Sequence, residues 1–227
     1  MLITKQFVFL HVPKTGGSFV QKLCQERLPP GSVIKQVPHG SHDVIPSEFA
    51  HLPRLCFVRN PWDWYVSWYH HGVRAAAEQR PFGRSLVWRV LFDEGRNDFR
   101  ATVAAASGGR QLVAPAGRGP RWLQAMNELD LDHYTATHRV MVGTGSEADR
   151  VEVGRFENLR EDFLDFLRRH DVPVGSEFEH AVLASPPENP GERGDYREYY
   201  DDELRELVGR RAHIMIEEFG YSFENGA

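Results

Sequence analysis

Residues 6–24 read QFVFLHVPKTGGSFVQKLC, and the pattern of apolar residues changes twice along this stretch. The apolar run of residues 6–12 predicts a buried β-strand, and apolar positions from Phe19 to Leu28 recur at helical spacing. Between these two patterns, residues 13–18 (PKTGGS) introduce a proline and two glycines, which interrupt regular structure. The stretch therefore predicts a strand, a glycine loop and a helix.

The predicted loop has the composition of an anion-binding site. Glycines let the backbone approach a ligand closely, and the N-terminus of the following helix adds unpaired N–H groups and positive potential. Lys14 supplies a cation, and Thr15 and Ser18 supply hydroxyl groups. In the common P-loop of ATPases the lysine follows the last glycine, whereas Lys14 precedes both glycines here. This order argues against a site for a metal-bound triphosphate, and a tight structural turn is the alternative interpretation.

A second strand–loop–helix pattern occupies residues 54–71, RLCFVRNPWDWYVSWYHH. Residues 54–58 predict a core strand that ends at Arg59, and the aromatic-rich helix after it carries Ser67. Ligands of open parallel sheets bind at the carboxyl ends of the strands, so we expect Arg59 in the same crevice as the glycine loop. A guanidinium and a hydroxyl together suit a phosphate group, while a salt bridge from Arg59 to Asp63 is the structural alternative.

The rest of the chain alternates between strand-like and helix-like patterns. Strands are predicted at residues 33–37, 140–143 and 151–156, and helices at residues 46–50, 84–94, 159–170 and 196–218. This alternation predicts an α/β fold, a three-layer sandwich around a central, mostly parallel sheet. We expect a single domain over residues 1–227, with residues 74–130 as a helical and loop insertion on the substrate side. Within it, residues 105–120 are interpreted as a binding loop or as a disordered segment.

The composition excludes several classes of protein. A net charge of −5 argues against binding nucleic acid through a dominant basic surface. No apolar run reaches the ~18 residues of a membrane span, and no signal-peptide pattern opens the chain. Cys24 and Cys56 lie in apolar stretches without metal-ligand spacing, so buried thiols are expected. These features predict a soluble, cytoplasmic protein that uses no metal.

The two motifs together resemble those of the sulfotransferases that use 3′-phosphoadenosine 5′-phosphosulfate (PAPS). HVPKTGGSF (residues 11–19) is similar to the 5′-phosphosulfate loop of that family. CFVRNPWDWYVSWYHH (residues 56–71) is similar to its 3′-phosphate motif, a strand that ends in arginine with a serine eight residues later. The resemblance covers residues 1–75 well and a stretch near the C-terminus loosely. It implies a sulfotransferase fold related to the P-loop NTPases, and transfer of a sulfuryl group from PAPS to a hydroxyl or an amine, leaving 3′-phosphoadenosine 5′-phosphate (PAP).

The resemblance also assigns individual residues to the nucleotide. They are Lys14 at the oxygen that bridges phosphate and sulfate, Thr15, Gly16, Gly17 and Ser18 at the 5′-phosphate, Phe19 on the adenine side, and Arg59 and Ser67 at the 3′-phosphate. Near the C-terminus, GERGDY (residues 191–196) resembles the glycine-rich loop that covers the 3′-phosphate in the family. The position of the usual arginine in that loop is Asn189 here, so Arg193 is the candidate to replace it.

The catalytic histidine of the family often follows the strand before the 3′-phosphate motif. VPHGSHDVIP (residues 37–46) offers His39 and His42 in that place. His39 lies directly at the predicted strand end and seven residues before Pro46, which resembles the spacing in members that act on small molecules. We therefore expect His39 to be the general base, a task that suits a side chain whose ordinary pKa is near neutrality. His42 is the second candidate, and for either histidine a surface position without catalytic role is the alternative.

Two other classes of function fit parts of the sequence. One is a small-molecule kinase that uses ATP, which the place of Lys14 and the Arg59/Ser67 pair disfavour. The other is a non-catalytic nucleotide-binding module, in which the aromatic helix would be a partner surface. The acceptor of a sulfotransferase would be a small molecule or a carbohydrate. Nine arginines against four acidic residues between positions 74 and 121 favour an anionic acceptor such as an acidic sugar, with a solvated basic surface as the alternative.

Overall fold

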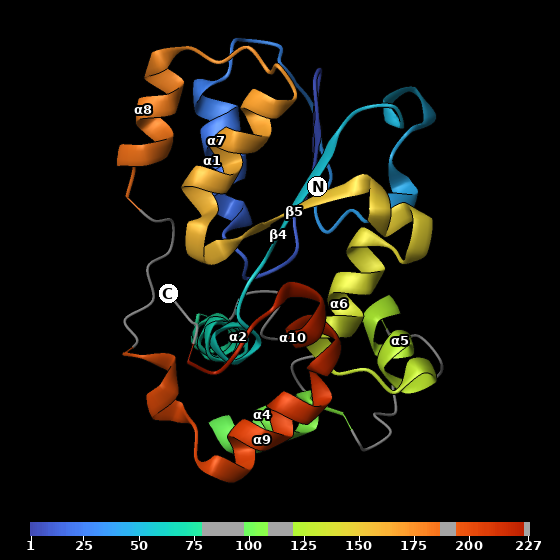
Figure 1. Ribbon diagram of the computed structural model, residues 1–227, viewed down its shortest axis with the longest axis vertical. Coiled ribbons are helices and arrows are strands. Elements are labelled where there is room, and N and C mark those ends of the chain that lie inside the picture. Colours follow the sequence, from blue (N-terminus) through green and yellow to red (C-terminus); the bar gives the residue numbers. More distant parts are fainter. Residues whose placement is uncertain (79–97, 109–119, 187–193, 225–227) are drawn as a thin grey trace. The chain divides into compact units, whose positions relative to one another are not determined.

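The computed structural model describes residues 1–78, 98–108, 120–186 and 194–224 (Figure 1). The chain divides into two compact units. The first consists of Met1–Arg59 and Met141–Pro190, and the second of Asn60–Val140 and Gly191–Ala227. One domain over residues 1–227 stays a prediction.

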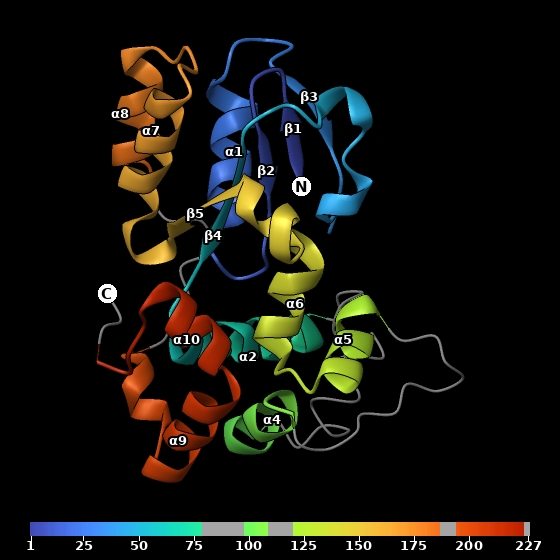
Figure 2. The same cartoon turned by 45° about the vertical axis from the view of Figure 1, so that its right-hand side comes forward.

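The first unit is built on a five-stranded mixed sheet with the strand order β3-β1-β2-β4-β5. The strands are β1 (Leu2–Thr4), β2 (Val8–Leu10), β3 (Val33–Gln36), β4 (Arg54–Val58) and β5 (Val151–Arg155). Strand β1 pairs antiparallel with β2 and β3, whereas the pairs β2–β4 and β4–β5 are parallel. Four of the five strands therefore run in one direction, and their carboxyl ends lie at the same edge of the sheet (Figure 2).

The first strand of the sheet, β1, was not predicted. Residues 6–12 were expected to form one strand, but the strand is Val8–Leu10 and a tight hairpin precedes it. Thr4 closes this hairpin, because its hydroxyl donates to the carbonyl of Phe7 at 2.8 Å and accepts from the amide of Phe7 at 2.9 Å. A strand of three residues is too short to produce a recognisable alternation of apolar and polar positions.

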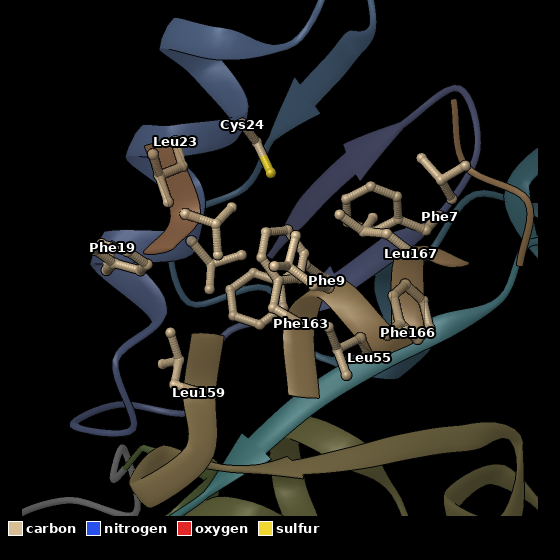
Figure 3. Close-up of a cluster of buried hydrophobic side chains, with 14 of the residues drawn as sticks. Phe7, Phe9, Phe19, Leu23, Cys24, Leu55, Leu159, Phe163, Phe166 and Leu167 are labelled. Atoms are coloured by element: carbon tan, nitrogen blue, oxygen red, sulfur yellow. The ribbon is translucent and has the colours of Figure 1, made fainter. Parts of the chain in front are cut away.

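Three helices cover one face of this sheet (Figures 1 and 2). They are α1 (Gly17–Arg27), α7 (Leu159–Arg169) and α8 (Ser176–Ala184). Figure 3 shows side chains of β2, α1 and α7 meeting in the core, where Phe7 lies edge-on to Phe166 with ring centroids 5.7 Å apart.

Cys24 belongs to this core, and burial raises the pKa of its thiol to about 12. Cys24 and Cys56 are both buried and free, which confirms the prediction for the thiols. The second helical layer of the sandwich stays a prediction.

The second unit is helical. Its helices are α2 (Pro61–Ala77), α4 (Phe99–Ala106), α5 (Arg121–Leu129), most of α6 (His133–Val142), α9 (Asp202–Arg211) and α10 (His213–Phe219). Asn60 begins α2 by accepting a hydrogen bond from the amide of Trp62, and Pro61 takes the first helical position. Trp64 and Tyr65 are fully buried, so the aromatic residues of α2 largely form core, as expected.

Two of the predicted elements take a different form. The strand expected at residues 140–143 is wrong, since residues 140–142 are the end of helix α6 and Gly143 follows the helix. Asp132 caps α6 by accepting from the amides of Tyr134 and Thr135, at 3.0 and 3.3 Å. A short apolar run is compatible with strand or buried helix, so periodicity alone could not separate the two. The single helix expected at residues 196–218 is interrupted, because Asp201 caps a new helix by accepting from the amide of Leu204 at 2.8 Å.

The short elements complete the description of the chain. They are the 3₁₀ turns η1 (His42–Val44), η2 (Ser47–Phe49), η6 (Gly145–Arg150), η7 (Phe156–Asn158) and η8 (Tyr196–Tyr199). The helix expected at residues 46–50 is the 3₁₀ turn η2, and helix α8 was not predicted. The helix expected at residues 84–94 lies outside the described residues. In the part of the chain that is described, no helix combines the length and apolar character needed to cross a membrane.

Candidate active site

Four sequence elements lie together at the carboxyl edge of the sheet in the first unit. The glycine loop follows β2, His39 follows β3, Arg59 follows β4 and Phe156 follows β5. Since these four strands run in one direction, their carboxyl ends share an edge, which is where ligands bind in open sheets of this kind. The sequence predicts the loop and Arg59 in one crevice, and the topology of the sheet puts both at the same edge.

The loop presents the uncapped N-terminus of α1. Gly16 is the N-cap of the helix with a φ of 82°, and neither a side-chain cap nor an acidic residue lies in the first turn. Within the described chain, the amides of Gly17 and Ser18 have no acceptor. A Cβ atom on Gly16 would lie 2.2 Å from Cδ1 of Leu159, so the loop packs tightly against the start of α7. Free amides at the positive end of a helix can bind an anion.

Thr15 and Phe19 face the interior of the unit. The hydroxyl of Thr15 is buried and donates to the carbonyl of Val12 at 2.8 Å, and this hydrogen bond stabilises the loop. The ring of Phe19 is buried in the core, and the guanidinium of Arg160 lies over it at 4.8 Å from the centroid. Ser18 is exposed at the start of α1. The contacts predicted for these residues with a nucleotide stay predictions.

Lys14 and His39 share an unusual backbone conformation. Their φ angles are 67° and 51°, in the left-handed region that side chains other than glycine rarely adopt. Asp130 and Asp171 are the other non-glycine residues with positive φ in the described ranges, and aspartate tolerates this region better than most residues. Strained backbone is frequent at functional sites, and here it coincides with the two residues predicted to be catalytic.

A tight turn explains the conformation of His39. The amide of Gly40 donates to the carbonyl of Val37 at 3.1 Å, with Pro38 and His39 at the two central positions. Proline followed by a residue with positive φ is the arrangement of a type II turn, in which glycine is the preferred third residue. The turn holds His39 exposed at the end of β3.

Arg59 connects the second motif to the first. The residue is 4% exposed, and its Nη1 donates to the carbonyl of Lys14 at 3.1 Å. Its guanidinium lies over the ring of Phe156, 3.8 Å from the centroid. Arginine has five N–H donors, so one guanidinium can bind several acceptors. The sequence predicted that Arg59 lies near the loop, but it did not predict this contact or the platform formed by Phe156.

His42 differs from His39 in its surroundings. Its Nδ1 lies 4.0 Å from Oε2 of Glu147, and the same oxygen accepts from Arg54 at 3.1 Å. The His42 ring also packs against Gly143, where a Cβ atom would lie 3.3 Å from it. His42 therefore belongs to a packed polar cluster, whereas His39 is exposed on its turn.

His11 also lies at this edge of the sheet, within the motif of residues 11–19, and no role was predicted for it. A Cβ atom on Gly17 would lie 2.0 Å from Cδ2 of the His11 ring. The ring stacks on Phe9 and lies near the side chain of Gln21. Burial lowers the pKa of His11 to about 4, with smaller contributions from His39 and Lys14. His11 is therefore neutral near pH 7.

The remaining predicted residues lie elsewhere. Ser67 belongs to α2 of the second unit, and Arg193 and Asn189 lie outside the described residues. No group of three or more histidine, cysteine, aspartate or glutamate side chains in the described ranges could hold a metal ion. The site of the first unit therefore consists of an uncapped helix N-terminus, two cationic side chains and an exposed histidine.

No protein-family model matches the chain, and no curated protein matches it. Among solved structures, mouse sulfotransferase SULT7A1 complexed with PAP is similar, with 14% sequence identity over 98% of this chain and 87% of that chain. The TM-score of this match is 0.47, and a similarity of this degree carries no conclusion about the activity of the chain.

Proposed function

We propose that this protein is a sulfotransferase that moves a sulfuryl group from PAPS to a hydroxyl or amine of a small molecule or carbohydrate. The observation that carries the proposal is the hydrogen bond from Arg59 to the carbonyl of Lys14. It joins the arginine of the 3′-phosphate motif to the lysine of the 5′-phosphosulfate motif. Two anion-binding elements in contact suit a nucleotide that is phosphorylated at two separate positions.

The residues of the loop fit the phosphosulfate end of such a nucleotide. The amides of Gly17 and Ser18 would hold the 5′-phosphate, since they have no acceptor within the described chain and begin a helix without an acidic residue. Lys14 would contact the bridging oxygen. Thr15 and Phe19 would support this end of the site through the shape of the loop.

The 3′-phosphate is assigned to Arg59 and Ser67. A guanidinium recognises phosphate through parallel N–H groups, and a hydroxyl adds one further donor. The contact of Arg59 with Lys14 gives the arginine a second task, because it ties the strand end to the loop. Arg193 is proposed as a further ligand of the same phosphate.

The transfer requires one base and one group that stabilises negative charge. His39 would accept the proton of the acceptor hydroxyl or amine as the new bond to sulfur forms. The bond between sulfur and the phosphate oxygen breaks on the opposite side, and Lys14 with the N-terminus of α1 would stabilise the charge that remains on that oxygen. His39 is preferred over His42 because it is exposed, whereas His42 packs beside Glu147.

A calorimetric titration tests this proposal. PAP, ADP and ATP with Mg²⁺ are titrated into the wild type, Arg59→Ala and the control Arg168→Ala, which changes an exposed arginine of α7. We expect a strong preference for PAP that Arg59→Ala abolishes and Arg168→Ala leaves intact. Tight binding of ATP with Mg²⁺ in place of PAP would support a kinase instead. Binding of PAP without transfer to any acceptor hydroxyl or amine would support the non-catalytic module.

A further inference from the structure

His11 occupies a specific place under the glycine loop. It is the first residue after β2, and its ring lies against the backbone of Gly17 at the first turn of α1. A Cβ atom on Gly17 would lie 2.0 Å from Cδ2 and 2.5 Å from Nε2 of the ring. No side chain larger than hydrogen fits at position 17 while His11 holds this place.

Two further contacts fix the ring. One face stacks on Phe9, with centroids 6.0 Å apart and an interplanar angle of 18°. Its polar edge lies near the side chain of Gln21, one turn after Gly17 on α1. The oxygen of Gln21 also accepts from Gln36 of β3 at 3.4 Å. The ring is therefore held between a strand of the sheet and the helix that begins at the loop.

We propose that His11 is a positioning residue that sets the first turn of α1, and thereby the direction in which the amides of Gly17 and Ser18 point. The inference rests on the proposed function, because it treats these amides as ligands of the donor nucleotide. In this role His11 does not touch the reacting atoms and acts through the loop.

The chemistry of the ring suits this task. A neutral imidazole adds no charge beside Lys14, and it keeps a polar atom on the side of Gln21. An apolar side chain of similar size would fill the space but would offer no polar atom toward the half-buried side chain of Gln21. Position 11 therefore requires a flat polar side chain, and glutamine is the replacement most similar to histidine in this respect.

The first test is a double-mutant cycle on the affinity for PAP with His11→Ala, Gly17→Ala and the combined variant. We expect each single change to weaken binding on the order of tenfold or more, and the double variant to bind better than Gly17→Ala alone, since the clash is then gone. His11→Gln should bind within about threefold of the wild type, as a conservative replacement of a positioning group does. Gln25→Leu is the control, because Gln25 lies one turn beyond Gln21 and bonds Gln36 instead.

The second test needs no nucleotide. The amides of Phe19 and Val20 donate to the carbonyl of Gly16 at 3.0 and 3.5 Å, so their hydrogen exchange reports on the first turn. His11→Ala should lower their protection, while His11→Gln and Gln25→Leu should not. If the wild type binds no PAP but His11→Ala still loosens this turn, the proposed function fails and the positioning role stands. If His11→Ala changes neither protection nor affinity, or if the two changes in the cycle are additive, the positioning role is wrong.

Discussion

Nη1 of Arg59 donates to the carbonyl oxygen of Lys14 across 3.1 Å, so the residue that ends β4 holds the loop that follows β2. The same guanidinium lies over the ring of Phe156, which follows β5. One side chain thus touches segments after two other strands of the sheet. Changes at this position should therefore affect both ligand binding and the stability of the loop.

Arg59→Lys keeps the positive charge but removes the planar fork, so it separates charge from geometry. A lysine ammonium cannot lie flat over Phe156 and reach the Lys14 carbonyl as the guanidinium does. We expect the affinity for PAP to fall by about one to two orders of magnitude, and the free energy of unfolding to fall by about 1–3 kcal/mol. Calorimetry and urea unfolding measure the two effects. With Arg168→Lys as control, an Arg59→Lys protein equal to the wild type in both would show that charge alone suffices.

Gly16→Ala tests how tightly the loop is packed. The residue has a φ of 82°, and a Cβ atom there would lie 2.2 Å from Leu159. Strain of the left-handed backbone costs about 1–2 kcal/mol and overpacking adds about 1–3 kcal/mol to the loss of unfolding free energy. Gly145→Ala is the matched control, since Gly145 also has a positive φ of 55° but no atom within 4 Å of the added carbon. Urea unfolding should show a larger loss at Gly16, and equal losses would mean that the loop yields to the methyl group.

The loop–helix units were the most predictable part of the molecule. At β4 the sequence RLCFV combines five buried residues with a following Asn-Pro pair, and the predicted and observed strands coincide. A glycine pair between an apolar run and a helical pattern likewise located the start of α1 near Gly16 and Gly17. In both places local signals and tertiary packing favour the same structure.

Other parts depend on contacts that no local pattern contains. Thr4 closes the β1–β2 hairpin through its hydroxyl, and Asp132 caps the helix α6, whose last residues had been expected to form a strand. The same is true of the candidate active site. His11 lies inside the recognised motif, but its role depends on the approach of its ring to Gly17, which only the folded chain reveals. The platform that Phe156 makes for Arg59 is a contact over a long sequence separation as well.

His39→Gly should separate activity from stability. His39 adopts a φ of 51° in a turn whose third position favours glycine, so the substitution relieves backbone strain. We expect a free energy of unfolding equal to that of the wild type or up to about 1 kcal/mol higher, and a transfer rate lower by about 10²-fold or more. Urea unfolding and single-turnover transfer from PAPS measure the two quantities, and PAP affinity should change little. A near wild-type rate would remove His39 from the mechanism, and the same measurement on His42→Gly would then test the second candidate.

Acid should destabilise the fold through its buried histidines. Burial lowers the pKa of His133 and His138 to about 3 and that of His11 to about 4, from an ordinary value of 6.5. As the pH falls below 6.5, the unfolded chain binds protons that the folded rings do not accept. The stability that is fully present above pH 6.5 is therefore lost progressively toward the folded pKa values. Each such ring adds a slope of up to about 1.4 kcal/mol per pH unit.

His138→Leu isolates one of these contributions. Both ring nitrogens of His138 are buried and have no hydrogen-bond partner within the described structure, so leucine removes polar atoms that gain nothing from the fold. We expect the variant to be at least as stable as the wild type at pH 7. Between pH 5.5 and 4, its unfolding free energy should decline less steeply, by about 1.4 kcal/mol per pH unit. Urea unfolding across this range tests the prediction, with His51→Leu at an exposed position as control. A slope unchanged from that of the wild type would mean that the folded chain takes up the proton at His138, and hence that water reaches the ring.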